Sequence, residues 1–121
     1  MEERRQLVRL DTRLEISYAV LSSDTPKKSV TKNVGGGGVC LFTEKELPIG
    51  TRLQVAMKLP DREALVHFIA EVVWSEAYEV IGKTQRQRAV ESGVRFIEIA
   101  PQDCEAVMRH VILSFQPHAA Q

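Results

Sequence analysis

The sequence predicts a mainly β fold, a small antiparallel barrel or sandwich that ends with one α-helix. Three observations support this prediction. Apolar and polar residues alternate in several short runs, which is the pattern of half-buried strands. Glycine, proline and small polar residues separate those runs, as they do in turns. The last run differs, because its apolar residues recur at helical spacing.

The first half of the chain contains four predicted strands. Every second residue from Leu14 to Val20 is apolar, which predicts a strand with one buried face. Residues 22–28 contain Asp24-Thr25-Pro26 and are predicted to form a loop. Further strands are expected at 29–34, 39–43 and 51–59, with a loop at 44–50 before the last of them.

The second half contains one long predicted strand and one short one. Alternate residues from Val66 to Trp74 are apolar and fall on one face of a strand at 64–74, which is long enough to contain a bulge. Residues 76–80 extend this hairpin. Residues 82–89 are polar and include three cations, which indicates a mobile loop; a second basic patch is the alternative. Strand character returns at 93–97.

The last segment is predicted to be an amphipathic helix laid on the sheet or across a barrel mouth. Pro101 suits a first helical position, and Asp103 suits the positive start of a helix. Pro117 ends the helix. Its expected apolar face holds Cys104, Val107, Met108, Val111 and Phe115. The chain is accordingly divided into an N-terminal arm at 1–12, the barrel with its helix at 13–116 and a tail at 117–121.

Charge and composition limit the possible partners. Lys plus Arg and Asp plus Glu both total 16, so no overall positive field favours DNA or RNA. The chain shows no signal peptide and no apolar run that could span a bilayer, so we expect a cytoplasmic domain. Cys40 and Cys104 lie far apart and are expected to stay reduced, and the three scattered histidines predict neither a metal site nor a cofactor.

The stretch from Asn33 to Gly38 is the most unusual in the chain, because four of its residues are consecutive glycines. Glycine in regular structure costs about 0.5–1 kcal/mol relative to alanine, so such a run indicates positive φ or a close approach by another group. A glycine-rich hairpin turn without a ligand is the alternative. The arginines at positions 4, 5, 9 and 13 form a local basic cluster that favours an anionic ligand.

Arg5-Gln-Leu-Val-Arg9, preceded by Arg4, and the later Asn33-x-x-x-x-Gly38 together resemble the two motifs of the PilZ family, RxxxR and [D/N]xSxxG. The segments 47–50, 71–74 and 93–96 and the closing helix also resemble their PilZ counterparts in order and spacing. The resemblance implies a six-stranded antiparallel β-barrel with one C-terminal α-helix. It also implies a receptor without chemistry of its own that binds the bacterial second messenger cyclic di-GMP.

The resemblance further implies which residues bind the ligand. Arg5 and Arg9 correspond to the paired arginines, and Arg4 corresponds to the basic residue before them. Asn33 and Gly38 correspond to the ends of the second motif. The arm is expected to change conformation on binding and, through a downstream effector protein, to regulate motility, surface polysaccharide or similar outputs.

Three other positions need a comment beside this resemblance. Gly35 stands where the family has serine, so a hydroxyl is missing and binding is expected to be weaker by about 1 kcal/mol. Trp74 is a candidate to stack on a base, with a place in the core or at the barrel end as the alternative. Arg95 alternates with apolar neighbours and is expected to point outward, toward the site or into solvent.

The main alternative function is a degenerate PilZ protein that binds no nucleotide and acts through protein contacts, as in type IV pilus assembly. Gly35 favours this alternative, whereas Arg5, Arg9 and Asn33 oppose it. An enzyme is not supported, since no catalytic constellation or phosphate loop is present in the sequence. An oligonucleotide-binding barrel is disfavoured by the neutral charge and the 6% aromatic content.

Overall fold

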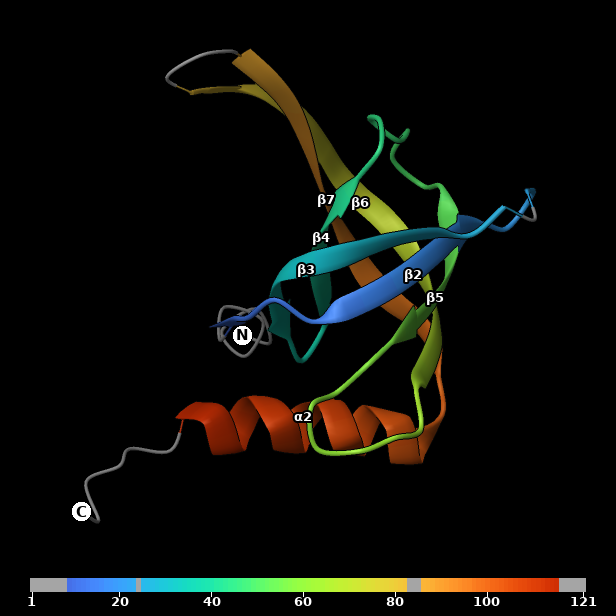
Figure 1. Ribbon diagram of the computed structural model, residues 1–121. Helices are drawn as coiled ribbons and strands as arrows, with labels where there is room; N and C mark the ends of the chain where they lie inside the picture. Colours follow the sequence, from blue (N-terminus) through green and yellow to red (C-terminus); the bar gives the residue numbers. More distant parts are fainter. Residues whose placement is uncertain (1–8, 24, 83–85, 116–121) are drawn as a thin grey trace, which may run out of the picture.

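The computed structural model describes residues 9–23, 25–82 and 86–115 (Figure 1). In chain order the strands and the helix are β1 (Arg9–Asp11), β2 (Glu15–Val20), β3 (Lys27–Gly35), β4 (Gly38–Thr43), β5 (Arg52–Met57), β6 (Val66–Ile81), β7 (Arg86–Ile99) and α2 (Pro101–Phe115). The long alternating runs thus form strands, and the run with helical spacing forms the helix, as the sequence predicts.

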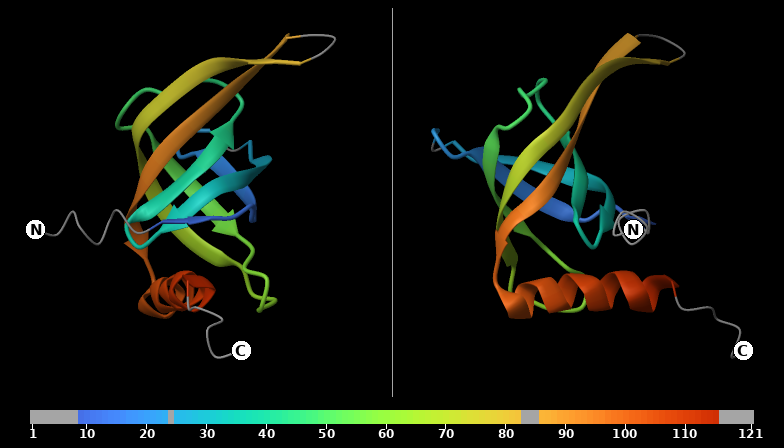
Figure 2. Two further views of the ribbon diagram at one scale, coloured as in Figure 1. Left: turned by 90° about the vertical axis from the view of Figure 1, so that its left-hand side faces the viewer. Right: turned by 180° about the vertical axis from the view of Figure 1, so that it is seen from behind.

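The strands close into a barrel. The sheet order is β1-β3-β2-β5-β6-β7-β4, and an additional pairing between β3 and β4 joins its ends. The six strands β2 to β7 therefore form a closed antiparallel barrel, and β1 adds to β3. Helix α2 lies across one end of this barrel (Figures 1 and 2). The expected six-stranded barrel with one C-terminal helix is confirmed.

The end of the N-terminal arm forms a strand, β1. Within the expected arm at 1–12, Arg9–Asp11 pair with β3, with Arg9 opposite Gly35 and Asp11 opposite Asn33. The preceding residues, which include Arg4 and Arg5, lie outside the described part of the chain. The pairing matters for function, because it brings Arg9 alongside the glycine-rich segment.

Strands β1 and β2 lie one after the other along the same edge of β3, and Thr31 of β3 bridges the gap between them. Strand β2 pairs with β3 up to Val30, and β1 pairs with it from Asn33 onward. In the gap, the fully buried Thr31 hydroxyl accepts a hydrogen bond from the Leu14 amide at 2.9 Å and donates one to the Thr12 carbonyl at 2.6 Å. The side chain therefore satisfies backbone groups that no neighbouring strand reaches.

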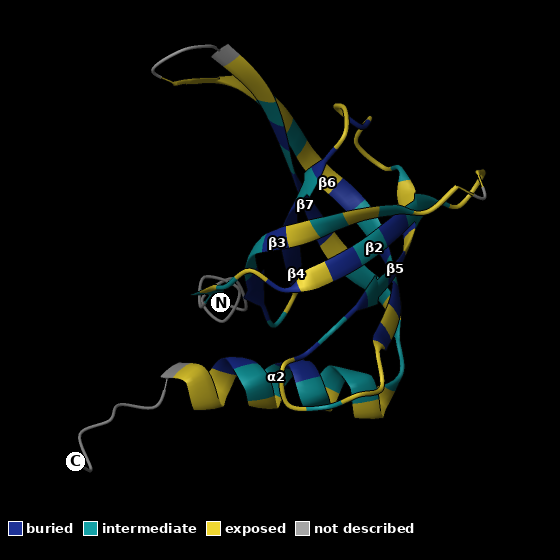
Figure 3. Cartoon of the chain, viewed as in Figure 1, coloured by how far each residue is buried: buried dark blue, intermediate teal, exposed yellow. Residues whose placement is uncertain are grey.

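The core fills the barrel and extends to the helix (Figure 3). Inward-facing residues alternate along each strand, and Val107 and Val111 of α2 pack against them at the barrel end. Phe68 and Phe96 meet edge to face, with ring centroids 4.7 Å apart. Such a pair adds about 0.5–1.5 kcal/mol to the stabilisation from buried area.

Two sequence expectations fail along β6 and β7. Trp74 does not share the buried face of Val72, because the register of β6 against β7 shifts between these two residues and turns the following side chains over. Trp74 is 40% exposed. The expected loop at 82–89 is also shorter, since β7 already begins at Arg86 and pairs with Ile81. Residues 86–89 instead belong to β7 and form, with the end of β6, a two-stranded ribbon that projects from the barrel (Figures 1 and 2).

Candidate functional site

A cleft of about 390 Å³ lies on the outer side of the barrel, next to the glycine-rich segment. Its walls come from β1, β3, β4, β6 and β7 and from the turn between β3 and β4. The cleft is lined by Arg9, Asn33, Gly37, Gly38, Val39, Cys40, Val73, Trp74, Gly93, Val94 and Arg95. Four of the residues predicted from the sequence, Arg9, Asn33, Gly38 and Trp74, are therefore in one place.

The strand register explains why these residues meet. Asn33 pairs with Cys40, Cys40 with Gly93, and Gly93 with Trp74, so one row crosses β3, β4, β7 and β6. Residues directly opposite each other in an antiparallel sheet point to the same face. These four residues therefore form the floor of the cleft, although Asn33 and Trp74 at the two ends of the row are far apart in the sequence.

Arg9 and Asn33 are joined directly. Arg9 Nε donates a hydrogen bond to Asn33 Oδ1 at 2.6 Å, and Arg9 Nη2 donates one to the Gly38 carbonyl at 3.2 Å. Partial burial lowers the pKa of the Arg9 guanidinium below its ordinary value, yet arginine remains a cation at neutral pH. The result is a positive planar group held in a defined orientation at the cleft.

Two of the four consecutive glycines, Gly36 and Gly38, allow close packing, and none of the four has an unusual backbone angle. Among the described residues, Gly50 is the only one with positive φ, at 95°, so that explanation does not apply to the glycines at 35–38. A Cβ at Gly38 would collide with the Val94 carbonyl oxygen of the neighbouring strand. At Gly36 it would lie 3.0 Å from Met108 Sδ of α2. The backbone of β7 therefore excludes a side chain at Gly38, and a side chain at Gly36 would require Met108 to shift.

Trp74 owes its position to Gly93. A Cβ at Gly93 would collide with the indole of Trp74, so the ring lies directly on the glycine backbone. The indole is partly exposed and lines the cleft. It is thus an aromatic surface at the site, and the alternative of a place in the core does not hold.

The lining residues that the sequence missed or left open include Arg95, Cys40 and Gly93. Arg95 does line the cleft, and its Nε donates a hydrogen bond to Glu71 Oε1 at 2.9 Å. Cys40 forms part of the floor, and burial raises the pKa of its thiol, which keeps it neutral. Gly93 contributes to the site because its lack of a side chain leaves room for the Trp74 indole. A correct register for β4 and β7 would have identified all of them, since Cys40 lies opposite Asn33, Arg95 lies opposite Gly38, and Gly93 lies opposite Cys40.

Three of the predicted site residues, Gly35, Arg4 and Arg5, are not among the described residues that line the cleft. Gly35 is buried in β3 opposite Arg9, and the residues that line the cleft do not include it. It shares the face of Asn33, two positions along the strand. Arg4 and Arg5 lie outside the described residues. Within those residues, no group of three or more His, Cys, Asp or Glu side chains is placed to hold a metal ion.

The fold and this site define the class of the protein. The model of the PilZ domain matches residues 3–113, which is nearly the whole chain, so the chain belongs to the PilZ family. PilZ domains are non-catalytic, which makes this chain a binding module rather than an enzyme. None of the curated proteins matches the chain in sequence.

Several solved structures share the fold. The PilZ domain of YcgR from Escherichia coli, with c-di-GMP, has a TM-score of 0.71 and 18% identity over 92% of this chain and 90% of its own. MotI/DgrA, a Bacillus subtilis inhibitor of motility, has a TM-score of 0.67 and 21% identity over 94% of this chain and 54% of its own. The Borreliella burgdorferi PlzA protein in complex with c-di-GMP has a TM-score of 0.63 and 12% identity over 95% of this chain and 55% of its own.

The chain thus spans about half the length of the latter two proteins, 54% and 55%. At these identities the likeness establishes the fold. The described ranges contain no helix with the length and apolar character needed to cross a membrane.

Proposed function

We propose that this PilZ domain is a receptor for cyclic di-GMP and binds it in the cleft between Arg9 and Trp74. The observation that supports this most directly is the Arg9 guanidinium, oriented by Asn33 and Gly38 at a cleft that also contains the only tryptophan of the chain. The structures of YcgR and PlzA with c-di-GMP support the choice of ligand.

The chemistry of the ligand matches these groups. Cyclic di-GMP has two phosphates and two guanines. An arginine can donate two parallel hydrogen bonds to a phosphate or to the O6 and N7 atoms of guanine. The exposed indole of Trp74 provides a surface for a base to stack on. The cleft volume of about 390 Å³ lies within the usual range for small-molecule sites.

The energies require more than one contact. A micromolar dissociation constant corresponds to about −8 kcal/mol, whereas association costs roughly 4–15 kcal/mol in lost freedom. Each charge-assisted hydrogen bond contributes about 1.5–3 kcal/mol. Arg9 alone is therefore insufficient, and in this proposal Arg4 and Arg5 supply further cationic donors from the arm.

In the same proposal the arm transmits the signal. Residues 1–8 change conformation when Arg4 and Arg5 contact the ligand, and a downstream effector protein responds with altered motility, surface polysaccharide or a similar output. Amide hydrogen exchange checks this step. We expect the amides of residues 2–8 to exchange more slowly with the nucleotide present, and equal rates in both states would contradict a role for the arm.

A calorimetric titration with cyclic di-GMP tests the receptor function. We expect the wild type to bind, and Arg5→Ala and Arg9→Ala to lose most of the binding. Arg109→Ala is the matched control, because Arg109 lies on α2 with its side chain 61% exposed and outside the cleft lining. Absence of binding by the wild type would contradict the proposal and would favour a PilZ protein that acts through protein contacts.

A further inference from the structure

The outer part of β6, which projects from the barrel, offers a second surface along the edge that does not face β7. From Val66 to Glu71, β6 pairs with β5 on one side, and from Phe68 onward it pairs with β7 on the other side. Backbone hydrogen bonds from Gly50 and to Thr51 continue the first side as far as Val72. From Val73 to Ile81, β7 is the only strand among the described residues that pairs with β6. In the described part of the chain, one edge of the ribbon therefore has no second strand beside it.

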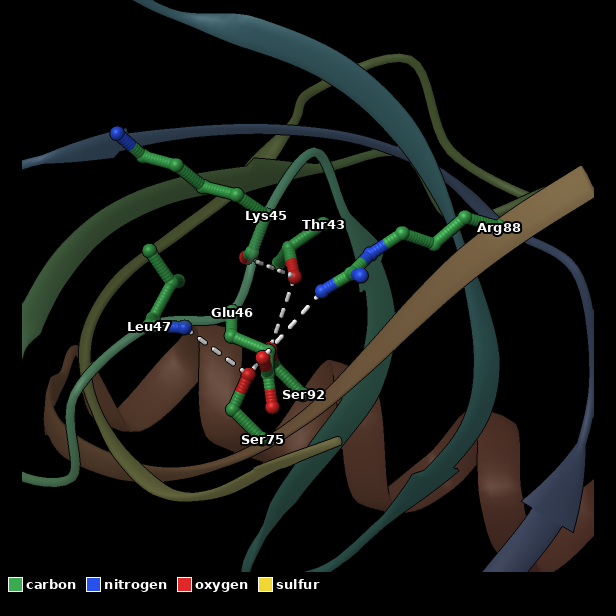
Figure 4. Close-up of polar contacts among 7 residues, drawn as sticks. All are labelled: Thr43, Lys45, Glu46, Leu47, Ser75, Arg88 and Ser92. Carbon is green, nitrogen blue, oxygen red and sulfur yellow. Dashed lines mark hydrogen bonds and ion pairs between the residues drawn. The ribbon is translucent and has the colours of Figure 1, made fainter. Parts of the chain in front are cut away.

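A network of hydroxyl groups holds the base of this ribbon in place (Figure 4). Thr43 Oγ1 donates to the Lys45 carbonyl at 3.0 Å and lies 2.9 Å from Ser92 Oγ, which lies 2.9 Å from Ser75 Oγ. The Leu47 amide donates to Ser75 Oγ at 3.0 Å. Since Thr43 donates to the carbonyl, Ser92 donates to Thr43 and Ser75 donates to Ser92. Each hydroxyl thus donates once and accepts once, and the network ties the loop after β4 to both ribbon strands.

The edge is unusually apolar for an exposed strand. Five of its large side chains are exposed: Val73 and Trp74 by 40% each, Tyr78 by 38%, Val80 by 46% and Ile81 by 75%. Proteins usually protect such edges with lysine, proline or a cover, because free strand backbone pairs readily with other chains. No lysine, arginine or proline occurs in β6. An exposed apolar edge of this length indicates an interaction surface.

The charges on β6 indicate what kind of strand fits. Its charged residues are all acidic: Glu71, Glu76 and Glu79. Glu71 and Glu79 face Arg95 and Arg88 of β7, but Glu76 faces Glu91, which is an unfavourable pair. Glu91 is itself engaged by Lys32 at 3.0 Å and by the Tyr78 hydroxyl at 2.6 Å. A cation placed beside Glu76 from the free side would relieve this repulsion.

A second copy of the chain is a poor occupant. Pairing of two β6 edges would place two purely acidic strands side by side. The basic free edge of β7 extends only over residues 86–89, because β4 covers the strand from Val90 onward. Pairing of β6 with that edge would also be head to tail, which builds an open chain rather than a closed dimer.

We propose that the β6 edge from Val73 to Ile81 binds an extended, basic and apolar segment of a partner protein as an added β-strand. Main-chain hydrogen bonds supply the affinity of such strand addition, and alternate side chains supply the specificity. Lysine or arginine of the partner lies beside Glu76, and apolar residues lie beside Tyr78 and Val80. The first two residues of this edge, Val73 and Trp74, also line the ligand cleft, so the two surfaces adjoin.

Two synthetic peptides test this proposal without any nucleotide. One has nine residues that alternate valine and lysine, and the other has glutamate in place of lysine. Each is titrated into the isotope-labelled domain while amide chemical shifts and hydrogen exchange are followed. We expect the lysine peptide to shift the amides of residues 73–81 and to slow their exchange, and the glutamate peptide to leave them unchanged.

Charge reversal provides the matched comparison. Glu76→Lys should weaken binding of the lysine peptide about fivefold and allow the glutamate peptide to bind, whereas Glu105→Lys on the exposed face of α2 should change neither. Shifts at other elements, equal binding of both peptides or indifference to Glu76→Lys would overturn the proposal. None of these outcomes depends on cyclic di-GMP, so failure here is distinguishable from failure of the receptor function.

Discussion

Arg9 Nε and Asn33 Oδ1 lie 2.6 Å apart although their residues are separated by 24 positions in the chain. The cause is the short strand β1, which pairs with the end of β3 so that the Arg9 side chain crosses diagonally toward Asn33 and Gly38. The second arginine of RxxxR and the first residue of the glycine motif therefore form one unit. The predictions below follow from this unit and from the groups around it.

Arg9→Lys should keep the positive charge but weaken the binding of cyclic di-GMP. Lysine lacks the planar fork that bonds Asn33 and the Gly38 carbonyl while presenting further donors to a ligand. Loss of one charge-assisted hydrogen bond of about 1.5–3 kcal/mol corresponds to binding weaker by about tenfold or more. Calorimetry with cyclic di-GMP measures the change, and Arg109→Lys is the control. Affinity equal to that of the wild type would show that charge alone suffices.

Gly93→Ala should act through Trp74. The added methyl group would occupy the space of the indole, which would have to move off the cleft floor. We expect cyclic di-GMP binding to fall about as far as in Trp74→Ala, with the barrel intact. Because the chain has one tryptophan, its intrinsic fluorescence reports the displacement directly. An unchanged emission spectrum together with unchanged affinity would count against stacking on Trp74.

Gly38→Ala should destabilise the fold itself. Here the added methyl group meets backbone, the Val94 carbonyl, and neither β4 nor β7 can move away without losing their pairing. Overpacking of this kind costs about 1–3 kcal/mol. Chemical denaturation should show this loss, whereas the exposed Gly37, substituted in the same way, should lose much less. Similar stability of both variants would refute the packing explanation.

Gly35→Ser should strengthen ligand binding several-fold. Gly35 lies on the face of β3 that carries Asn33, opposite Arg9, and its φ is not positive, so serine is compatible with the backbone. The restored hydroxyl can bond the ligand or orient the guanidinium, a contribution of about 1 kcal/mol. Calorimetry on this variant beside Gly35→Ala separates the hydroxyl from the added carbon. Equal affinities in the two variants would assign no role to the hydroxyl.

The Glu91 cluster should make stability depend on pH in acid. Burial raises the pKa of Glu91, but hydrogen bonds from Tyr78 and Lys32 more than offset this and leave the pKa below its ordinary value of 4.5. A depressed carboxyl pKa stabilises the fold above the unfolded value, and this stabilisation is lost as pH falls through the folded value. Melting temperatures should therefore differ by several degrees between wild type and Glu91→Gln at pH 7 and converge as the pH falls from 4.5 through the lowered pKa of Glu91. A difference that persists in acid would point to packing instead.

Much of the fold was predictable because one face of each strand is buried. The alternation from Leu14 to Val20 and from Val66 to Val72 matches buried positions in β2 and β6, and Val107 and Val111 match the buried face of α2. These patterns depend on local spacing, which the sequence contains in full. Arg9, Asn33 and Gly38, which the family resemblance singled out, line one cleft together with Trp74, and their role in binding a ligand stays a prediction.

The remaining features depend on pairing between distant strands. The bulge after Val72 turns Trp74 outward, and alternation cannot show where a register shifts. Strand character at Arg86–Ala89 comes from pairing with β6 and overrides the polar composition. The roles of Cys40, Gly93 and Arg95 likewise follow from the register of β4 and β7 against their neighbours.

An amide chemical-shift titration of the isotope-labelled domain with cyclic di-GMP tests the central claim most directly, because it locates the ligand as well as detecting it. The account predicts saturable shifts concentrated at Arg9, Asn33, Gly37, Gly38 and Gly93 and at the indole N–H of Trp74. Saturable shifts centred on another face of the barrel, or no shifts at millimolar nucleotide, would contradict it.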